Sequence, residues 1–270
     1  MKKLNLITTL LALLIVLFGC KKETPKETPT CSFVYSAWTA CSNNIQTRTY
    51  TSSPSGCSGT PPADSTQRSC SLFINDLPVT DIEGNVYNTV KLGNQTWTTK
   101  NLNVGKYRNG DPIPQVQDNT AWTNLTTGAW CYYLNNTANG TSYGKLYNWY
   151  AVKDPRGLAP TGYHIPTDAE WTSLTTYLGG ETGAGTTMKS TSGWLNNGNG
   201  TNTSGFEGLP GGCRFSFGDF GNIGNRASWW SSSEISTVNA WSRSLDNYNG
   251  DVNRYYSNPH VGYSVRCIKD

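Results

Sequence analysis

The sequence predicts an α+β protein in which an antiparallel sheet and two helices follow a small disulfide-rich β module. Four cysteines lie within 40 residues, from Cys31 to Cys70, which indicates a small module that disulfides hold together. Thr167 and Glu170 mark the start of a helix, and β-type runs separated by polar turns fill the end of the chain. The sequence of the main domain therefore predicts, in chain order, a hairpin, helices, a long loop region and a final antiparallel sheet.

Residues 1–19 have the pattern of a signal peptide. A positive start is followed by an apolar stretch at residues 4–18, which is shorter than the roughly 20 residues of a membrane-spanning helix. Its end, Leu17-Phe18-Gly19-Cys20, resembles the lipobox of bacterial lipoproteins. The resemblance implies cleavage before Cys20 and a diacylglycerol on its thiol, which would hold the protein to the membrane. An uncleaved anchor and an ordinary signal peptide are the alternatives.

Residues 20–30 are the predicted lipid anchor and tether. After Cys20 they are charged, contain two prolines and have no aliphatic or aromatic side chain, so they bury no apolar surface. The Cys-Lys-Lys-Glu start resembles the charged signal behind the lipidated cysteine of surface-displayed lipoproteins of Bacteroidetes. The resemblance implies an outer-membrane or cell-surface location.

Charge argues against a nucleic-acid partner. The formal net charge of the whole chain is +3, and cleavage removes Lys2 and Lys3 and no acid, which leaves +1. No cluster of Lys and Arg with interleaved aromatics occurs in the sequence. The 28 glycines, 10 tryptophans and 15 tyrosines, with only 14% charged residues, are typical of a turn-rich extracellular protein.

The cysteine-rich module spans residues 31–71. Its aliphatic residues are few, so burial alone cannot stabilise it and disulfides are expected. The four cysteines, which are Cys31, Cys41, Cys57 and Cys70, allow three pairings. Each closed loop would add about 3 kcal/mol in the chain-entropy model.

The same module resembles a thrombospondin type 1 repeat. The run from Trp38 to Ser42, together with the stretch around Arg48, carries the resemblance. It implies a cation–π stack of Trp38 on Arg48, with Arg68 as a looser candidate, and the pairings Cys31–Cys57 and Cys41–Cys70. The module is expected to act as an adhesive or spacer, or as a stalk without a ligand, which we favour.

The remaining chain, residues 77–270, is the predicted main domain. Strands are expected at residues 86–91 and 95–101, and helices at residues 143–152 and after the N-cap Thr167. The stretch 181–205 is rich in Gly, Asn, Ser and Thr and is expected to be irregular. Four final strands are expected at residues 227–234, 238–246, 251–257 and 261–268.

Several motifs in residues 80–270 resemble the Fibrobacter succinogenes major paralogous (FISUMP) domain. They are Gly84–Tyr87, Gln95–Trp97, Lys100–Leu102, Tyr143–Trp149, Gly162–Trp171, Leu209–Gly212, Trp229–Glu234 and Ser264–Cys267. The motif Pro-Thr-Asp-Ala-Glu-Trp is also similar to formylglycine-generating enzymes and other C-type-lectin-like folds. The resemblance implies a C-type-lectin-like domain and carries no enzyme chemistry with it.

No catalytic residue is expected, and no cofactor other than calcium. A formylglycine-type oxidase needs a close pair of active-site cysteines that binds copper, whereas we expect a structural disulfide between Cys213 and Cys267, or between Cys131 and Cys267. His164 and His260 are far apart in sequence, and no neighbouring residues suggest a triad.

The turn 246–251 is rich in oxygen atoms and is the candidate calcium site, although a plain hairpin turn explains it equally well. The motifs Glu-Pro-Asn and Trp-Asn-Asp, which bind sugar and calcium in animal C-type lectins, are absent from the sequence.

Aromatic residues crowd the last strands and are the candidate ligand contacts. They are Trp229, Trp230, Trp241, Tyr248, Tyr255 and Tyr256. Trp229 and Trp230 should face opposite sides of a regular strand, so one of them is expected to be exposed. The predicted function is non-catalytic binding of glycan or of another surface protein. A display module without a small ligand, and a cryptic oxidase, are the alternatives.

Overall fold

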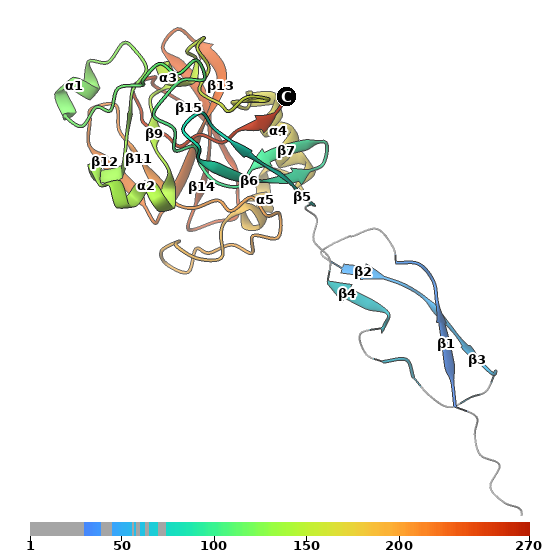
Figure 1. The fold of residues 1–270 in the computed structure, drawn as a ribbon. Helices are drawn as coiled ribbons and strands as arrows, with labels where there is room; N and C mark the ends of the chain where they lie inside the picture. The colour runs from blue at the N-terminus through green and yellow to red at the C-terminus, as the bar shows by residue number, and fades with distance from the viewer. Residues whose placement is uncertain (1–29, 39–44, 56, 58–59, 63–64, 70–73) are drawn as a thin grey trace, which may run out of the picture. The chain divides into compact units, whose positions relative to one another are not determined.

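The computed structural model describes residues 30–38, 45–55, 57, 60–62, 65–69 and 74–270. These residues form two compact units, one from the described residues within 30–38 and 47–67, and the other from residues 45–46 and the described residues within 68–270 (Figure 1). The predicted signal peptide, the lipid site Cys20, the tether up to residue 29 and the predicted Cys41–Cys70 pair lie outside the described residues. Within the described part, no helix is long and apolar enough to cross a membrane.

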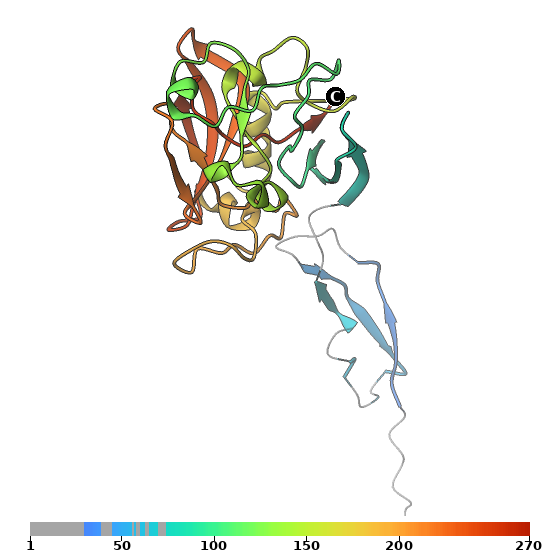
Figure 2. The ribbon, with the colours of Figure 1, turned by 60° about the vertical axis from the view of Figure 1, so that its left-hand side comes forward.

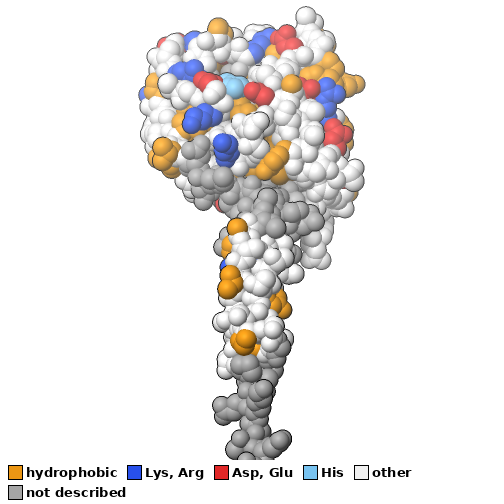
Figure 3. Space-filling model, turned by 90° about the vertical axis from the view of Figure 1, so that its right-hand side faces the viewer, with side chains coloured by type: hydrophobic (Ala, Val, Ile, Leu, Met, Phe, Trp, Pro, Cys, Tyr) orange, Lys and Arg blue, Asp and Glu red, His pale blue; other side chains and the backbone are white. Residues whose placement is uncertain are grey.

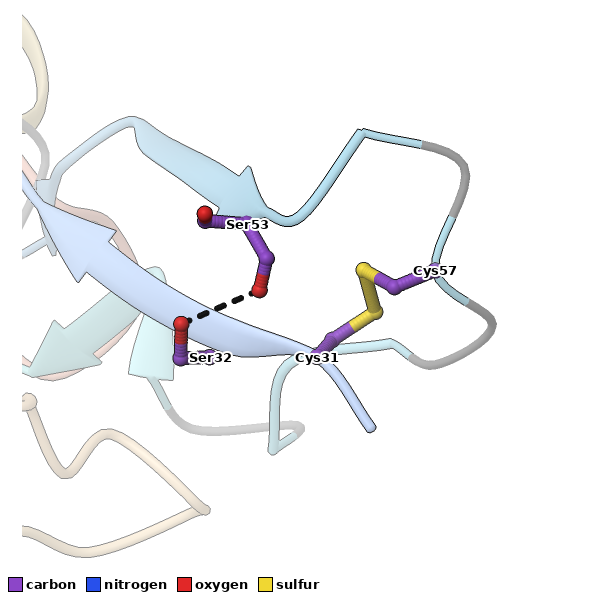
Figure 4. The surroundings of a disulfide bond; sticks show 4 residues. All are labelled: Cys31, Ser32, Ser53 and Cys57. Atoms are coloured by element: carbon purple, nitrogen blue, oxygen red, sulfur yellow. Dashed lines mark hydrogen bonds between the residues drawn. A yellow bond between two sulfur atoms is a disulfide. The ribbon is translucent and has the colours of Figure 1, made fainter. Parts of the chain in front are cut away.

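The N-terminal unit is built on a two-stranded antiparallel ribbon. Strand β1 (Ser32–Tyr35) pairs with β3 (Tyr50–Ser53). A separate ribbon, not confined to this unit, pairs β2 (Ile45–Thr47) with β4 (Gln67–Ser69). At the start of β1, Cys31 forms a disulfide with Cys57, and the hydroxyl of Ser32 donates to the carbonyl of Ser53 (Figure 4). The disulfide and this hydrogen bond join the two strands at one end of the ribbon.

Arg48 holds the aromatic side chains of the N-terminal unit together. Its guanidinium carbon lies 4.1 Å from the ring centroid of Tyr35 and 4.3 Å from that of Trp38. Its Nε also donates to the carbonyl of Ser65 at 2.6 Å. The expected stack of Trp38 on Arg48 is therefore present, and cation–π contacts stabilise a unit that has few aliphatic residues.

The C-terminal unit contains a five-stranded sheet in the order β10-β16-β7-β6-β5. Its strands are β5 (Ile74–Thr80), β6 (Val86–Leu92), β7 (Gln95–Thr98), β10 (Tyr163–His164) and β16 (Ile268–Lys269). The pairs are antiparallel. The chain end thus pairs with the opening hairpin, where Ile268 lies opposite Trp97.

A three-stranded antiparallel sheet joins β13 (Arg226–Ser236), β14 (Asn239–Asp246) and β15 (Asn253–Ser257). Two short ribbons pair β8 (Trp130–Cys131) with β9 (Leu146–Tyr147), and β11 (Gly211–Arg214) with β12 (Phe220–Ile223). The last predicted strand, residues 261–268, is mostly irregular. Its backbone instead forms isolated bridges to three other segments, one of them between Trp229 and Ser264.

The helices are short except for α4 (Asp168–Tyr177), which has the predicted capping box between Thr167 and Glu170. The others are α1 (Asn119–Thr123), the 3₁₀ turn η2 (Tyr133–Asn135), α2 (Thr137–Tyr143), α3 (Trp149–Val152) and α5 (Glu181–Met188). A single helix over 143–152 is wrong, because Gly144 breaks it at φ 73° and Asn148 caps a new one. The stretch 181–205, expected to be irregular, contains α5, although the backbone is not helical at Thr182 and Gly183.

The main core lies between the two sheets and α4. Trp97 from β7, Trp171 from α4, Trp229 from β13 and Phe206 are fully or almost fully buried in one hydrophobic cluster. The ring centroids of Trp97 and Trp171 are 4.7 Å apart, and those of Phe206 and Trp229 are 5.5 Å apart. Figure 2 shows α4 between the teal strands of the five-stranded sheet and the orange strands of the three-stranded sheet.

A buried arginine ties the chain end to this core. Arg266 donates from Nε to Oδ1 of Asn101, and from its Nη atoms to the carbonyls of Thr98, Phe206 and Glu207. Burial lowers the pKa of Arg266 to about 9, so the guanidinium still carries its proton at neutral pH.

His164 links the N-terminus of α4 with the C-terminal residue. Its Nδ1 lies 2.7 Å from Oδ1 of Asp270, and its Nε2 lies 2.9 Å from Oε1 of Glu170. A neutral imidazole has one N–H, and an ionised carboxylate only accepts, so both hydrogen bonds together require the imidazolium. Burial acts to lower the pKa of His164, but the hydrogen bonds and charges of Asp270 and Glu170 outweigh it and raise the pKa.

The contribution of His164 to stability is expected to depend on pH. A raised folded-state pKa stabilises the protein fully below the unfolded pKa, and the effect is lost as pH rises through the folded pKa. Urea midpoints of the wild type and of His164→Gln, measured from about pH 5 to about pH 9, should therefore differ at acid pH and converge at alkaline pH. A difference that stayed constant over this range would contradict the imidazolium assignment.

Candidate functional site

Trp229 and Trp230, two of the six predicted ligand contacts, belong to the core. They are 1% and 0% exposed, so the expectation that one of them is exposed is wrong. Trp229 packs against Trp171, with ring centroids 5.9 Å apart, whereas Trp230 packs in a second cluster against Tyr263, with centroids 4.8 Å apart. The two side chains do face opposite ways, and a hydrophobic cluster covers each face of β13.

Trp241 and Tyr256 lie on the face of the three-stranded sheet that α4 covers. They are cross-strand partners on β14 and β15, and their rings meet edge-on at 6.2 Å. The guanidinium carbon of Arg254 lies 3.5 Å from the ring centroid of Trp241, while its Nη2 donates to Asp168 at the start of α4. One face of Trp241 is therefore already covered by a fixed arginine.

Tyr248 and Tyr255 lie beside the ion pair between Arg226 and Asp246. Nε of Arg226 lies 2.5 Å from Oδ1 of Asp246, and the hydroxyl of Tyr248 donates to Oδ2 at 3.3 Å. The guanidinium carbon of Arg226 lies 5.9 Å from the ring centroid of Tyr255. The rings are 74% and 45% exposed. We call Arg226, Asp246, Tyr248, Asn253 and Tyr255 the tyrosine site.

The tyrosine site takes its geometry from β-sheet register. Arg226 and Asp246 are cross-strand partners on β13 and β14, which places their side chains on one face. Tyr255 points to the same face because it lies opposite Ser242, an even number of residues from Asp246. Tyr256, the next residue on β15, points to the other face. The sheet thus separates the exposed tyrosines into two surfaces.

A polar pocket adjoins the tyrosine site and shares Asn253 and Tyr255 with it. The pocket has a volume of about 280 Å³. It is lined by Glu181, Thr182, Asp251, Val252, Asn253, Arg254 and Tyr255. The N–H of Val252 donates to the carbonyl of Glu181 at 2.8 Å, which fixes the start of α5 beside β15. Carboxylate, amide and hydroxyl groups beside an aromatic ring suit a ligand that carries many hydroxyl groups.

Positively charged side chains outnumber negatively charged ones around Asp246. Its buried carboxylate accepts from Arg226 and also from Nδ2 of Asn253 at 3.0 Å. Burial acts to lower the pKa of Arg226, but the hydrogen bond to Asp246 outweighs it and raises the pKa. The amino group of Lys189 lies 3.1 Å from the carbonyl of Asp246 and 2.7 Å from that of Asn249. Arg226 therefore pairs with the carboxylate of Asp246, while Lys189 brings a second positive charge to the neighbouring backbone carbonyls.

Oxygen atoms of the candidate calcium turn, residues 246–251, are engaged in these contacts and in hydrogen bonds within the turn. Lys189 supplies positive charge to two of its carbonyls, and Oδ1 of Asn249 accepts from the N–H of Asp251. In the part of the chain that the structure describes, no group of three or more His, Cys, Asp or Glu side chains is placed to hold a metal ion. Calcium binding stays a prediction.

The three late cysteines are buried free thiols, so the predicted disulfide between Cys213 and Cys267, and its alternative between Cys131 and Cys267, are wrong. Cys267 and Cys131 lie in different hydrophobic clusters, while Sγ of Cys213 accepts from Nδ2 of Asn222 at 3.7 Å. Burial raises the pKa of Cys131 to about 12 and that of Cys213 to about 11. These surroundings disfavour thiolates and lend no support to copper oxidase chemistry.

The surface of the C-terminal unit is mixed in character where Figure 3 displays it. Positive and negative side chains are interspersed there, and apolar side chains are scattered. The two histidines have separate local partners, because His164 binds the carboxylates described above while Nδ1 of His260 hydrogen-bonds to Oδ1 of Asn258.

Sequence reasoning missed Arg226, Asn253 and the polar pocket. Arg226 lies one residue before the predicted strand 227–234, and its partner Asp246 ends the predicted strand 238–246. A hairpin register drawn through these two strands could have paired them. Nothing local marks the pocket, since Glu181 and Asp251 are far apart in the sequence.

A comparison with protein-family models matches residues 90–269 to the Fibrobacter succinogenes major domain. Searches of curated proteins and of solved structures found no match. The matched stretch covers two thirds of the 270 residues and includes the tyrosine site and the polar pocket. The chain therefore belongs to the Fibrobacter succinogenes major domain family.

Proposed function

We propose that this protein is a lipid-anchored surface protein whose C-terminal unit binds glycan without catalysis, through the tyrosine site and the polar pocket. The observation that carries the proposal is the pair of exposed rings, Tyr248 and Tyr255, beside hydrogen-bonding groups of both kinds. Sugar rings stack on aromatic faces, while their hydroxyl groups pair with carboxylates and amides.

The anchor and the finer fold are part of the same proposal. The lipobox-like end at Cys20 and the charged residues behind it support attachment to the membrane. The shared motifs of residues 80–270 support a C-type-lectin-like fold, with which the antiparallel sheets and few helices are compatible. A glycan-binding unit displayed outside the membrane would reach its ligand directly.

A glycan array probed with the full chain in detergent tests this function. We expect binding to a defined set of glycans, and we expect Tyr255→Ala and Tyr248→Ala each to weaken it by about tenfold, because each removes a stacking ring. Tyr256→Ala is the matched control, since it removes an exposed ring from the opposite face of the same strand.

The outcomes separate the candidate functions. An array without any glycan signal would refute glycan binding and favour a display module or a protein partner. Loss of binding in Tyr256→Ala but not in Tyr255→Ala would place the site on the other sheet face. Circular dichroism of each variant checks that the fold is intact.

A further inference from the structure

We propose that the tyrosine site selects acidic glycans, with Arg226 binding the carboxylate of a uronic acid residue. The inference rests on the proposed glycan-binding function and names its ligand class. The three nitrogens of the Arg226 guanidinium differ in their hydrogen-bond partners. Nε is committed to the buried carboxylate of Asp246, and Nη1 and Nη2 donate to none of the residues that the structure describes.

Asp246 holds the guanidinium in place. Its carboxylate is 2% exposed and accepts from Arg226, Tyr248 and Asn253. The side chain of Arg226 is 34% exposed, so it is anchored at Nε by Asp246 and is still partly open to solvent. A planar guanidinium with two free NH2 groups matches a carboxylate through two parallel hydrogen bonds.

The neighbouring charges favour an anion at this end of the site. Lys189 contributes a second positive charge beside Asp246, and its ammonium is buried on backbone carbonyls. Glu181 and Asp251 line the adjoining pocket, where they would repel a second acidic group and accept hydrogen bonds from hydroxyl groups. The carboxylate of the ligand is therefore expected at Arg226, and a neutral part of the sugar in the pocket.

The aromatic rings restrict the anion to one attached to a sugar. Tyr255 lies beside the guanidinium at 5.9 Å, and Tyr248 contacts the same carboxylate that anchors Arg226. A pyranose ring that stacks on either tyrosine can carry its carboxylate to the guanidinium. A free inorganic anion would use the guanidinium alone and gain nothing from the rings.

Titration calorimetry of the full chain in detergent with three probes tests the inference. The probes are a short oligogalacturonide, the same oligosaccharide after reduction of its carboxyl groups, and a sulfated galactan oligosaccharide. We expect the oligogalacturonide to bind at least about tenfold more tightly than the reduced form, and the preference to shrink as salt is added.

Arg226→Lys is the decisive variant, because it keeps the charge beside Asp246 and loses the planar fork. It should lose about tenfold in affinity for the oligogalacturonide and little for the reduced form. Arg156→Lys, a change at an exposed arginine outside the site, is the matched control and should change neither affinity.

Equal binding of the acidic and reduced sugars, with losses in Tyr255→Ala, would overturn the acidic preference and leave glycan binding standing. Equal binding of the sulfated sugar and the oligogalacturonide would overturn the carboxylate assignment. If neither the oligogalacturonide nor its reduced form binds while the array identifies other, neutral glycans, the inference fails and the proposed function does not.

Discussion

Replacing Arg266 by Met is expected to lower the free energy of unfolding by about 4 kcal/mol. The variant keeps an apolar stem but removes four donated hydrogen bonds, to Asn101 and to the carbonyls of Thr98, Phe206 and Glu207. The side chain is 1% exposed, so water cannot replace these donors without opening the core. Each buried acceptor left without a donor costs roughly 1–3 kcal/mol.

Urea unfolding followed by circular dichroism measures the effect. Arg266→Lys should recover only part of the loss, because an ammonium cannot reproduce the planar fork of the guanidinium. Lys153→Met is the control, since Lys153 pairs with Glu234 on the surface, where an ion pair is worth about 1 kcal/mol or less. An Arg266→Met loss as small as that of the control would contradict the assigned role.

Replacing Trp229 by Ala is expected to cost about 4 kcal/mol as well, through a cavity in the main core. The indole packs against Trp171 and Phe206, and its Nε1 donates to Oδ1 of Asn101 at 2.8 Å. Arg266 donates to the same oxygen at 2.7 Å. The two substitutions share a partner, so the double variant should lose less than the sum of the single losses.

Urea unfolding also measures the effect of Trp229→Ala, of the double variant and of a control variant. Tyr256→Ala removes a ring that is 61% exposed and should change stability by about 0.5 kcal/mol or less. Strict additivity of Trp229→Ala and Arg266→Met would show that Asn101 does not couple them. A Trp229→Ala loss near that of Tyr256→Ala would show that the core between the sheets does not depend on this indole.

Local sequence signals predicted those parts of the fold that local hydrogen bonds stabilise. The capping box at Thr167 and Glu170 forms as expected, because both of its hydrogen bonds lie within one turn. Strands β6, β13 and β14 were located to within two residues at each end, from runs of β-type residues bounded by polar turns. The stack of Arg48 on Trp38, which is present, was expected from the resemblance to a thrombospondin type 1 repeat.

Long-range packing decided the parts that the sequence did not predict. Leu146 and Trp149 have helical spacing, but they belong to different hydrophobic clusters, so the chain bends between them instead of forming one helix. Helix α5 has no apolar period, and its Ala184 and Met188 are buried by the main core. The candidate site was predicted only in part, because sheet register separates Tyr255 from Tyr256 and brings Arg226 to Asp246.

Strand β13 separates two hydrophobic clusters, with Trp229 in one and Trp230 in the other. At Trp229 and Trp230 the strand has no exposed surface left for recognition, and a change on either side opens a cavity. Tyr248 and Tyr255 are exposed and belong to neither of these clusters. Substitutions at exposed positions of β15 and of the turn before it are therefore expected to change stability little, while the buried tryptophans of β13 carry the stability.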